Sequence, residues 1–246
     1  MQPMEKRLLQ SADCVVVQTE KDRQWVSQIT NGRLAHATHV VSNGINPELL
    51  LAPAPTVTAT FGHAGSLSLP SNARTVRWLL NQVLPAVHRT CPTATLSVLG
   101  SPGPADLMDR LTRHVAVRYV PRVEKMQEFF ATVPILIVRN YKDIGLITRT
   151  IEAMGAGVVV IGEPGAFNGI RRFRDGVHGF VAERTCDVAD VLVRLFSDSA
   201  LIAEVSQAAR ALIREDFRRE DRFDFVQKLL EGMACSNPSA SRAHAA

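Results

Sequence analysis

Cysteine is scarce in this sequence, and no two cysteines stand at metal-binding spacing. The 246 residues include four cysteines, with no C-x-x-C pair among them. This spacing indicates neither a zinc site nor a disulfide framework. We therefore expect no bound metal and reduced thiols at Cys14, Cys91, Cys186 and Cys235.

Long hydrophobic runs are also absent. No apolar stretch approaches the roughly 18 to 20 uncharged residues that a membrane span requires. The N-terminal segment MQPMEKRLLQ carries charges where a signal peptide has an apolar core. We therefore expect a cytoplasmic protein with no membrane span.

Neither sign of charge dominates the sequence. The formal net charge is +4, and the arginines gather in RRFR (residues 171–174) and in DFRREDR (residues 216–222), where acidic residues alternate with them. This balance is too mild to indicate a nucleic-acid partner. With 46% hydrophobic and 21% charged residues, the chain has enough apolar material for a sizeable core.

Several motifs for catalysis and cofactor binding are missing. The sequence has no G-x-S-x-G elbow, no Walker lysine motif and no H-E-x-x-H. No predicted strand is followed by G-x-G-x-x-G, which argues against an NAD or FAD enzyme, and we expect no cofactor. His63 is the only histidine near a predicted strand end. Without an orienting partner, a structural role is favoured for it over general-base catalysis.

From about residue 57 onward, apolar runs of strand length alternate with stretches of helical period. This alternation predicts the α/β class, with a doubly wound parallel sheet and crossover helices. The predicted strands lie within residues 56–65, 93–100, 115–120, 134–139, 158–162 and 179–183. The predicted helices start near Ser71 and include residues 105–113, 123–131, 146–154, 167–173, 186–198, 201–216 and 223–230. We expect one domain over residues 57–233 and a disordered tail over residues 234–246.

The first fifty residues form a separate predicted unit. ADCVVVQ and ATHVVS have strand character, and helices are expected before the first of them and from Thr19 onward. Residues 51–56 belong to a Pro/Ala-rich linker. Two parallel strands alone leave both faces and an edge uncovered. We therefore expect residues 1–50 to be a small α/β lobe, the remnant of a domain, that self-associates or binds a protein partner.

Three loops follow predicted strand ends, where an open parallel sheet binds its ligands. In the first loop, Gly65 lets the backbone approach a ligand closely, and Ser71 can cap the next helix. This loop can hold a phosphate, or it can be a tight turn that needs glycine for its own geometry. In the loop VPRV, backbone groups at Val120 can contact a nucleobase edge, with Arg122 near phosphate.

The remaining loop leads into the predicted helix that carries Glu152. Arg149 and Glu152 are three residues apart and can share one helix face. A carboxylate is a bidentate acceptor suited to a vicinal diol, such as that of ribose. The same spacing also fits a surface glutamate paired with Arg149.

Taken together, these segments resemble the donor-binding half of the GT-B glycosyltransferases, family 4 in particular. The resemblance covers most of residues 12–232 and rests on ADCVVVQTEKDRQWV, VVSNGIN, GSLSLPSNARTVRWLLNQVLP, LSVLG, VPRV and IEAMGAGVVV. It implies a Rossmann-like domain in which Glu152 binds the ribose of a nucleotide-sugar donor. The loop at Gly65 and Ser66 would then lie against the diphosphate, and the loop around Val120 would meet the base.

The sequence departs from the family pattern on the sugar side of this site. Family 4 enzymes commonly carry a second glutamate eight residues before the one matched by Glu152. This chain has Ile144 there, with Asp143 and Gly145 beside it. Asp143 and Gly145 are therefore the expected donor-binding residues of that segment.

Two further departures concern the diphosphate and the acceptor. No basic pair is evident near Gly65, so the candidates to replace it are Arg122, Lys142 and Arg149. The chain matches only the last fifty residues or so of an acceptor-binding domain, which would also supply the usual catalytic base.

The resemblance implies a glycosyltransferase that uses a nucleotide-sugar as substrate and acts when a partner supplies the acceptor half. Two alternatives stay open. One is an inactive remnant that binds a nucleotide-sugar or a protein, and the other is a nucleotide-sugar epimerase.

Overall fold

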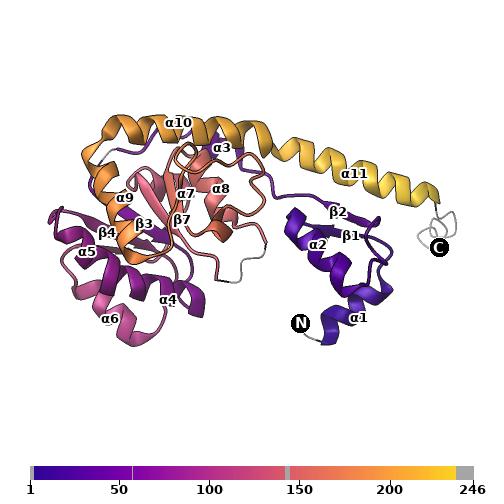
Figure 1. Ribbon diagram of the computed structural model, residues 1–246, viewed down its shortest axis with the longest axis horizontal. Helices are drawn as coiled ribbons and strands as arrows, with labels where there is room; N and C mark the ends of the chain where they lie inside the picture. The colour runs from indigo at the N-terminus through magenta and orange to yellow at the C-terminus, as the bar shows by residue number, and fades with distance from the viewer. Residues whose placement is uncertain (1–2, 57, 142–144, 237–246) are drawn as a thin grey trace.

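The computed structural model describes residues 3–56, 58–141 and 145–236 of the chain. Two parallel sheets organise these residues, one of two strands near the N-terminus and one of six strands in the larger part. Figure 1 shows the two parts side by side, with the C-terminal helix α11 (Arg219–Ser236) extending from the larger part along the smaller one.

Two helices and two strands make up the small lobe: α1 (Pro3–Ser11), β1 (Val15–Val17), α2 (Glu20–Ile29) and β2 (Thr38–Val40). The two strands pair in parallel, with Val16 opposite His39. Helix α2 starts where it does because Thr19 and Asp22 form a reciprocal capping box. The Thr19 hydroxyl accepts from the backbone N–H of Asp22 at 3.1 Å, and the Asp22 carboxylate accepts from the backbone N–H of Thr19 at 3.0 Å.

The chain leaves the lobe through a short helix, α3 (Pro47–Leu50), which packs on the larger part. A proline at the first helical position and the side chain of Asn46, which accepts a backbone hydrogen bond, define its start. Ile45 and Leu49 are 2% and 3% exposed and belong to the core of the larger part. That core therefore includes residues that precede the Pro/Ala-rich segment.

Six parallel strands form the larger sheet: β3 (Thr60–Ala64), β4 (Thr95–Leu99), β5 (Val117–Val120), β6 (Ile135–Val138), β7 (Val159–Gly162) and β8 (Phe180–Val181). Their spatial order is β5-β4-β3-β6-β7-β8. The chain runs outward from β3 to β5, returns to place β6 beside β3, and runs outward again to β8. This is the doubly wound order. Each strand lies within a predicted run, and the predicted α/β fold is confirmed.

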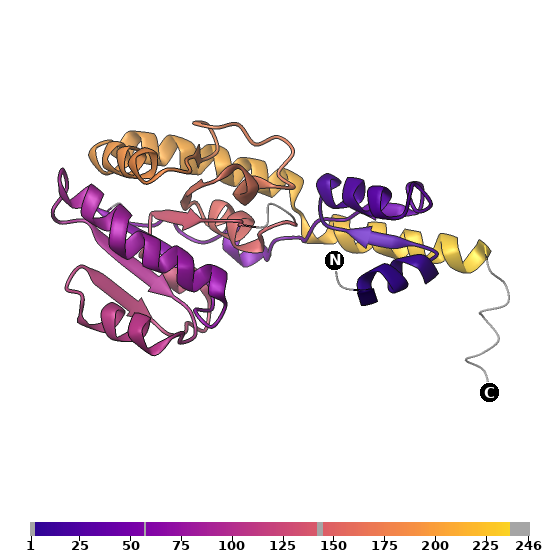
Figure 2. The same ribbon diagram turned by 60° about the horizontal axis from the view of Figure 1, so that its bottom comes forward.

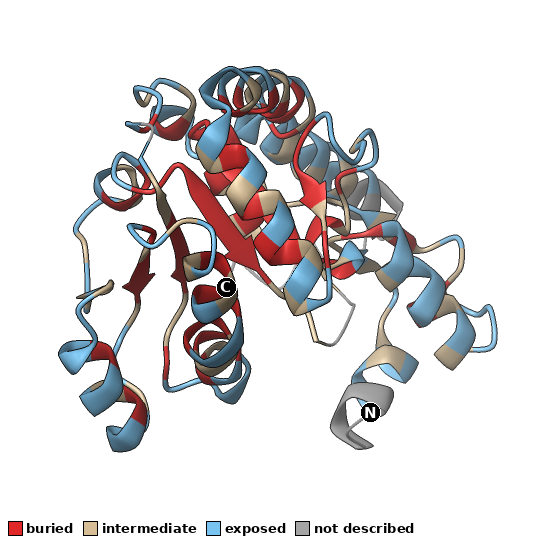
Figure 3. Ribbon diagram, turned by 60° about the vertical axis from the view of Figure 1, so that its left-hand side comes forward, coloured by how far each residue is buried: buried red, intermediate tan, exposed pale blue. Residues whose placement is uncertain are grey.

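Helices cover both faces of this sheet. One face packs against α4 (Pro70–Trp78), the π-helical turn η1 (Leu79–Val83), α5 (Leu84–His88), α6 (Ala105–Arg113) and α9 (Thr185–Ser197). The other face packs against α3, α7 (Met126–Phe130) and α8 (Thr148–Gly155), and α10 (Ser199–Asp216) contributes to both cores. Strand β6 alternates between them, with Ile135 and Ile137 in one core and Leu136 and Val138 in the other. Figure 3 shows this buried sheet between exposed helix surfaces.

The predicted helix over residues 167–173 is wrong. A single 3-10 turn, η2 (Pro164–Phe167), ends at its first residue, and the chain continues in turns. Gly169 adopts a φ of +83°, in the left-handed region that a right-handed helix cannot contain. The arginines that follow Gly169 therefore project from a loop.

Helix α11 connects the two parts of the molecule. Between α10 and α11, the backbone oxygen of Phe217 accepts from the N–H of Ile45 at 2.9 Å. Further along, the Phe225 ring lies 6.2 Å from the ring of His39 on β2. Figure 2 shows the helix running along the lobe. It ends three residues into the predicted tail, whose remaining residues, 237–246, lie outside the described part of the chain.

Among the described residues, no helix combines the length and the apolar character that a membrane span requires.

Candidate functional site

The switch point of the large sheet lies between β3 and β6, and His63 joins these two strands. Its Nδ1 lies 3.1 Å from the backbone oxygen of Ile137 on β6. A carbonyl oxygen only accepts hydrogen bonds, so Nδ1 carries the proton and Nε2 is left as an acceptor. Nε2 is buried and has no hydrogen-bond partner among the described residues. The switch point therefore contains an unsatisfied acceptor, which sequence reasoning had not identified.

The pKa of His63 lies below its ordinary value. Burial is the main cause, because it disfavours the charged imidazolium. The positive charge of Arg149 acts in the same direction, whereas the contacts with Ile137 and Asn72 oppose it. The imidazole is therefore neutral at pH 7, and Arg149 and Asn72 are both close to it.

Gly65 and Ser66 follow β3 directly and lie against α4. The side chain of Asn72 on α4 donates to the backbone oxygen of Ser66 at 2.9 Å. A Cβ atom at Gly65 would lie 2.5 Å from Nδ2 of Asn72, closer than van der Waals contact allows. The Ser66 hydroxyl accepts from Ser101 Oγ at 2.9 Å. Packing of the loop thus explains the glycine, and phosphate binding by this loop stays a prediction.

Ser71 does not cap α4. The helix begins at Pro70, and Leu69 occupies the cap position without a side-chain hydrogen bond. Proline is favoured at the first helical position because its missing N–H has no intrahelical acceptor there. The predicted cap is wrong because Pro70 starts the helix before Ser71.

Glu152 lies in the middle of α8 and pairs with Arg149. Oε2 of Glu152 is 2.8 Å from Nη1 of Arg149, and the two side chains are 24% and 31% exposed. Burial raises the pKa of the Glu152 carboxyl, and the charge of Arg149 opposes this rise. The ion pair is thus mostly buried, which distinguishes it from the exposed pair that the spacing also allowed.

Neighbouring contacts connect this ion pair to the loop after β3. Gly65 lies against Asn72, and the interaction of Asn72 with the imidazole of His63 raises the pKa of that imidazole. The charge of Arg149 lowers the pKa of the same imidazole, and Arg149 forms an ion pair with Glu152. The two predicted site segments therefore both lie near His63 and Asn72, two residues that the sequence analysis had not assigned to the site.

Val120 ends β5, and its position relative to Gly65 follows from the sheet order. Its backbone oxygen accepts from the N–H of Gly100 at 3.1 Å. A Cβ at Gly100 would in turn collide with the backbone oxygen of Gly65. The loops after β3, β4 and β5 are therefore in successive contact. Arg122, two residues beyond Val120, is exposed.

The segment before α8 is described only in part. Asp143, a predicted site residue, lies outside the described residues. Gly145 adopts a φ of +73°, and its N–H donates to the Asp22 carboxylate of the lobe at 3.0 Å. Close by, Asn43 of the lobe donates to the hydroxyl of Thr148 at 3.0 Å. The loop that leads to Glu152 is thus attached to the lobe.

A second polar cluster, which sequence reasoning missed, lies at the same edge of the sheet. Arg139 follows β6 directly and lies 3.3 Å from Glu163, which follows β7. The Arg139 guanidinium also lies 4.5 Å from the ring centroid of Trp78 and 4.9 Å from that of Tyr141. In the sequence, the signal for this cluster was a charged residue directly after each of the apolar runs of β6 and β7, namely Arg139 and Glu163.

Comparison with known proteins agrees with this architecture. Among solved structures, the chain is similar to Anabaena HepE in complex with UDP, at 16% identity and a TM-score of 0.76, over 94% of this chain and 68% of that one. It is similar to TarM from S. aureus at 19% identity and a TM-score of 0.75, over 93% of this chain and 46% of that one. It also resembles sucrose-phosphate synthase from Thermosynechococcus elongatus at 17% identity and a TM-score of 0.72, over 94% of this chain and 61% of that one.

These likenesses establish the fold, which is the Rossmann-like α/β fold of GT-B proteins. The chain spans 68% of the length of HepE and less than half of that of TarM. A comparison with curated proteins gave no match. Residues 58–198, more than half of the chain, match the family described as Glycosyl transferases group 1. The chain belongs to the glycosyl transferases group 1 family.

Proposed function

We propose that the chain binds a nucleotide-sugar donor at the switch point between β3 and β6 and serves in glycosyl transfer of the family 4 type. One observation carries the proposal: the Glu152–Arg149 ion pair lies near enough to His63 on β3 for the charge of Arg149 to lower the pKa of that imidazole, and the loop at Gly65 follows β3 directly. Ligands of open α/β sheets bind at this point of the fold.

Ligands of similar proteins support a uridine nucleotide-sugar as the first donor to test. HepE has been solved with UDP and with UDP-glucose. The pneumococcal O-GlcNAc transferase GtfA, which has a TM-score of 0.75 with this chain, has been solved with UDP and GlcNAc.

Glu152 and Arg149 would share the polar recognition of the donor. An ionised carboxylate can accept hydrogen bonds from both hydroxyls of a ribose, and a guanidinium can donate to diphosphate oxygens. The two groups bind each other at 2.8 Å in the chain as described. The donor would therefore exchange this ion pair for contacts of its own with both residues.

The other predicted residues would complete the donor site around this pair. Gly65 and Ser66 would lie along the diphosphate, with the backbone N–H of Ser66 as the donor, since that of Gly65 donates to the backbone oxygen of Leu99 at 2.8 Å. Val120 and Arg122 would face the base, while Asp143 and Gly145 would contact the sugar.

Isothermal titration of the chain with uridine, guanosine and adenosine diphosphate sugars tests donor binding. We expect saturable binding of one of them. No binding of any nucleotide-sugar would contradict the proposal. An assay for release of the nucleoside diphosphate then separates a transferase from a protein that binds the donor without turnover.

We also propose that the lobe is completed by further polypeptide, either a protein partner or a second copy of the chain, which would present the acceptor. The exposed fractions of Val16 on β1 and Val40 on β2 are 49% and 37%. Each of the two strands has one edge without a strand neighbour among the described residues. Such edges and apolar side chains favour association.

A further inference from the structure

The structure contains a cleft of about 690 Å³ between the lobe and the larger part. The lobe contributes the junction of β1 with α2 and the end of β2. The larger part contributes the loop after η2 and the junction of α10 with α11. This volume is typical of a small-molecule site. None of the proposed donor residues lines the cleft, so it is separate from the switch point.

Positive charge dominates the lining of this cleft. Four cationic side chains and two carboxylates line it. The cationic residues come from three separate segments and are Lys21, Arg171, Arg172 and Arg222. Like charges gathered in a cleft repel one another unless an anion offsets them.

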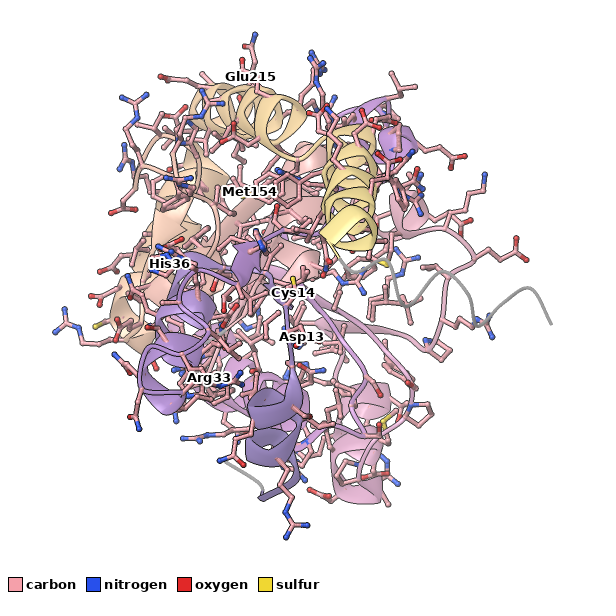
Figure 4. All side chains as sticks on the ribbon, turned by 90° about the vertical axis from the view of Figure 1, so that its right-hand side faces the viewer. Asp13, Cys14, Arg33, His36, Met154 and Glu215 are labelled. Atoms are coloured by element: carbon pink, nitrogen blue, oxygen red, sulfur yellow. The ribbon has the colours of Figure 1, made fainter. Side chains whose placement is uncertain are left out.

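The carboxylates around the cleft are already paired. Glu20 binds Arg23, which does not line the cleft. Asp216 holds Arg172 at 2.6 Å, and Glu215 holds the same guanidinium at 2.7 Å. Figure 4 shows Glu215 on α10, above the lobe. These acids therefore neutralise Arg172 but leave the charges of Arg171 and Arg222 uncompensated.

Arg171 is the cation best placed for a ligand. Arg171 is exposed and makes no hydrogen bond or ion pair with the described residues. It lines the cleft opposite Glu20 and Lys21 of the lobe. Arg222 donates to the backbone oxygen of Asp216, but its Nε is buried without a partner among the described residues.

We propose that this cleft binds a phosphate-bearing small molecule that bridges the lobe and the larger part. Guanidinium and ammonium groups form strong, charge-assisted hydrogen bonds with phosphate oxygens. Val40, which is 37% exposed, provides apolar surface for the organic part of the ligand.

Titration of the full chain with inorganic pyrophosphate and with glucose 1-phosphate tests this site. We expect saturable binding that Arg171→Gln weakens by about tenfold or more. Arg118→Gln is the matched control, since it removes one exposed arginine outside the cleft. It should leave the affinity within about twofold of that of the unmodified chain.

A second control separates this site from the proposed donor site. Arg149→Gln should leave the Arg171-dependent binding intact, even if the chain binds no nucleotide-sugar. Amide-exchange protection should rise on binding at residues 18–21 and 169–172 together. No saturable binding below about 10 mM, equal affinity in Arg171→Gln, or loss of binding in Arg149→Gln would overturn the proposal.

Discussion

The Glu152 carboxylate and the Arg149 guanidinium are 2.8 Å apart, with only 24% and 31% of their side chains exposed. Burial raises the pKa of Glu152, and Arg149 favours its ionised form. The pair therefore holds a carboxylate at a mostly buried position beside the switch point of the sheet. A ligand that binds Glu152 must compete with Arg149.

Glu152 should make the stability of the chain depend on pH. Because its folded-state pKa lies above the ordinary 4.5, the folded chain binds this proton more tightly than the unfolded chain does. The free energy of unfolding should therefore fall as the pH rises from 4.5 through the raised folded-state pKa. In Glu152→Gln, this part of the pH dependence of the free energy of unfolding should be absent. Urea unfolding of the unmodified chain and of Glu152→Gln at a series of pH values measures this difference. Parallel pH profiles of the two proteins would contradict the raised pKa of Glu152.

His63 should respond to pH in the opposite direction. Its folded-state pKa lies below 6.5 because burial and Arg149 disfavour the imidazolium. As the pH falls below 6.5, the unfolded chain takes up a proton that the folded chain does not, and stability is lost. NMR titration of the His63 imidazole measures its pKa directly. A value at or above 6.5 would show that the ring is not shielded as described.

Gly100→Ala should destabilise the loops at the edge of the large sheet. The added methyl group would collide with the backbone oxygen of Gly65, which cannot rotate away as a side chain can. We expect a loss of about 1 to 3 kcal/mol in the free energy of unfolding. Gly232→Ala is the control, because nothing lies within 4 Å of the added atom on α11. Equal stabilities of the two variants would contradict the packing described here.

Residues 1–50 should mediate association in solution, because β1 and β2 expose apolar side chains and unpaired edges. Light scattering is expected to show self-association that increases with concentration, unless a partner is present. A monodisperse monomer, with strong amide-exchange protection of Val15, Val16 and Val17, would show that the lobe is complete by itself.

The sequence allowed the sheet to be predicted well because its strands are short, mostly apolar runs between helical segments, and β6 and β7 are apolar throughout. The effect of a single proline or glycine on the backbone was harder to predict. Pro70 set the start of α4 in place of Ser71, and Gly169 turned a predicted helix into a loop. The helical spacing of apolar residues does not indicate where a proline starts a helix or where a glycine interrupts one.

Contacts between individual side chains of distant segments could not be predicted. The Asp22 carboxylate accepts from the N–H of Gly145, which is 123 residues away in the sequence, and the charge of Arg149 lowers the pKa of His63. The individual candidates Gly65 and Glu152 were accessible from sequence. The residues that connect them depend on the fold, so they became apparent only in three dimensions.

The central claim is that Glu152 binds the donor, and titration calorimetry with the nucleoside diphosphates UDP, GDP and ADP tests it most directly. One of these should bind the unmodified chain, and Glu152→Gln should weaken that binding by about 1 to 3 kcal/mol, the scale of a hydrogen bond to a charged acceptor. Glu204→Gln, a change at an exposed glutamate of α10, should bind as the unmodified chain does. If Glu152→Gln binds the nucleotide as tightly as the unmodified chain, or if no nucleotide binds, the account is contradicted.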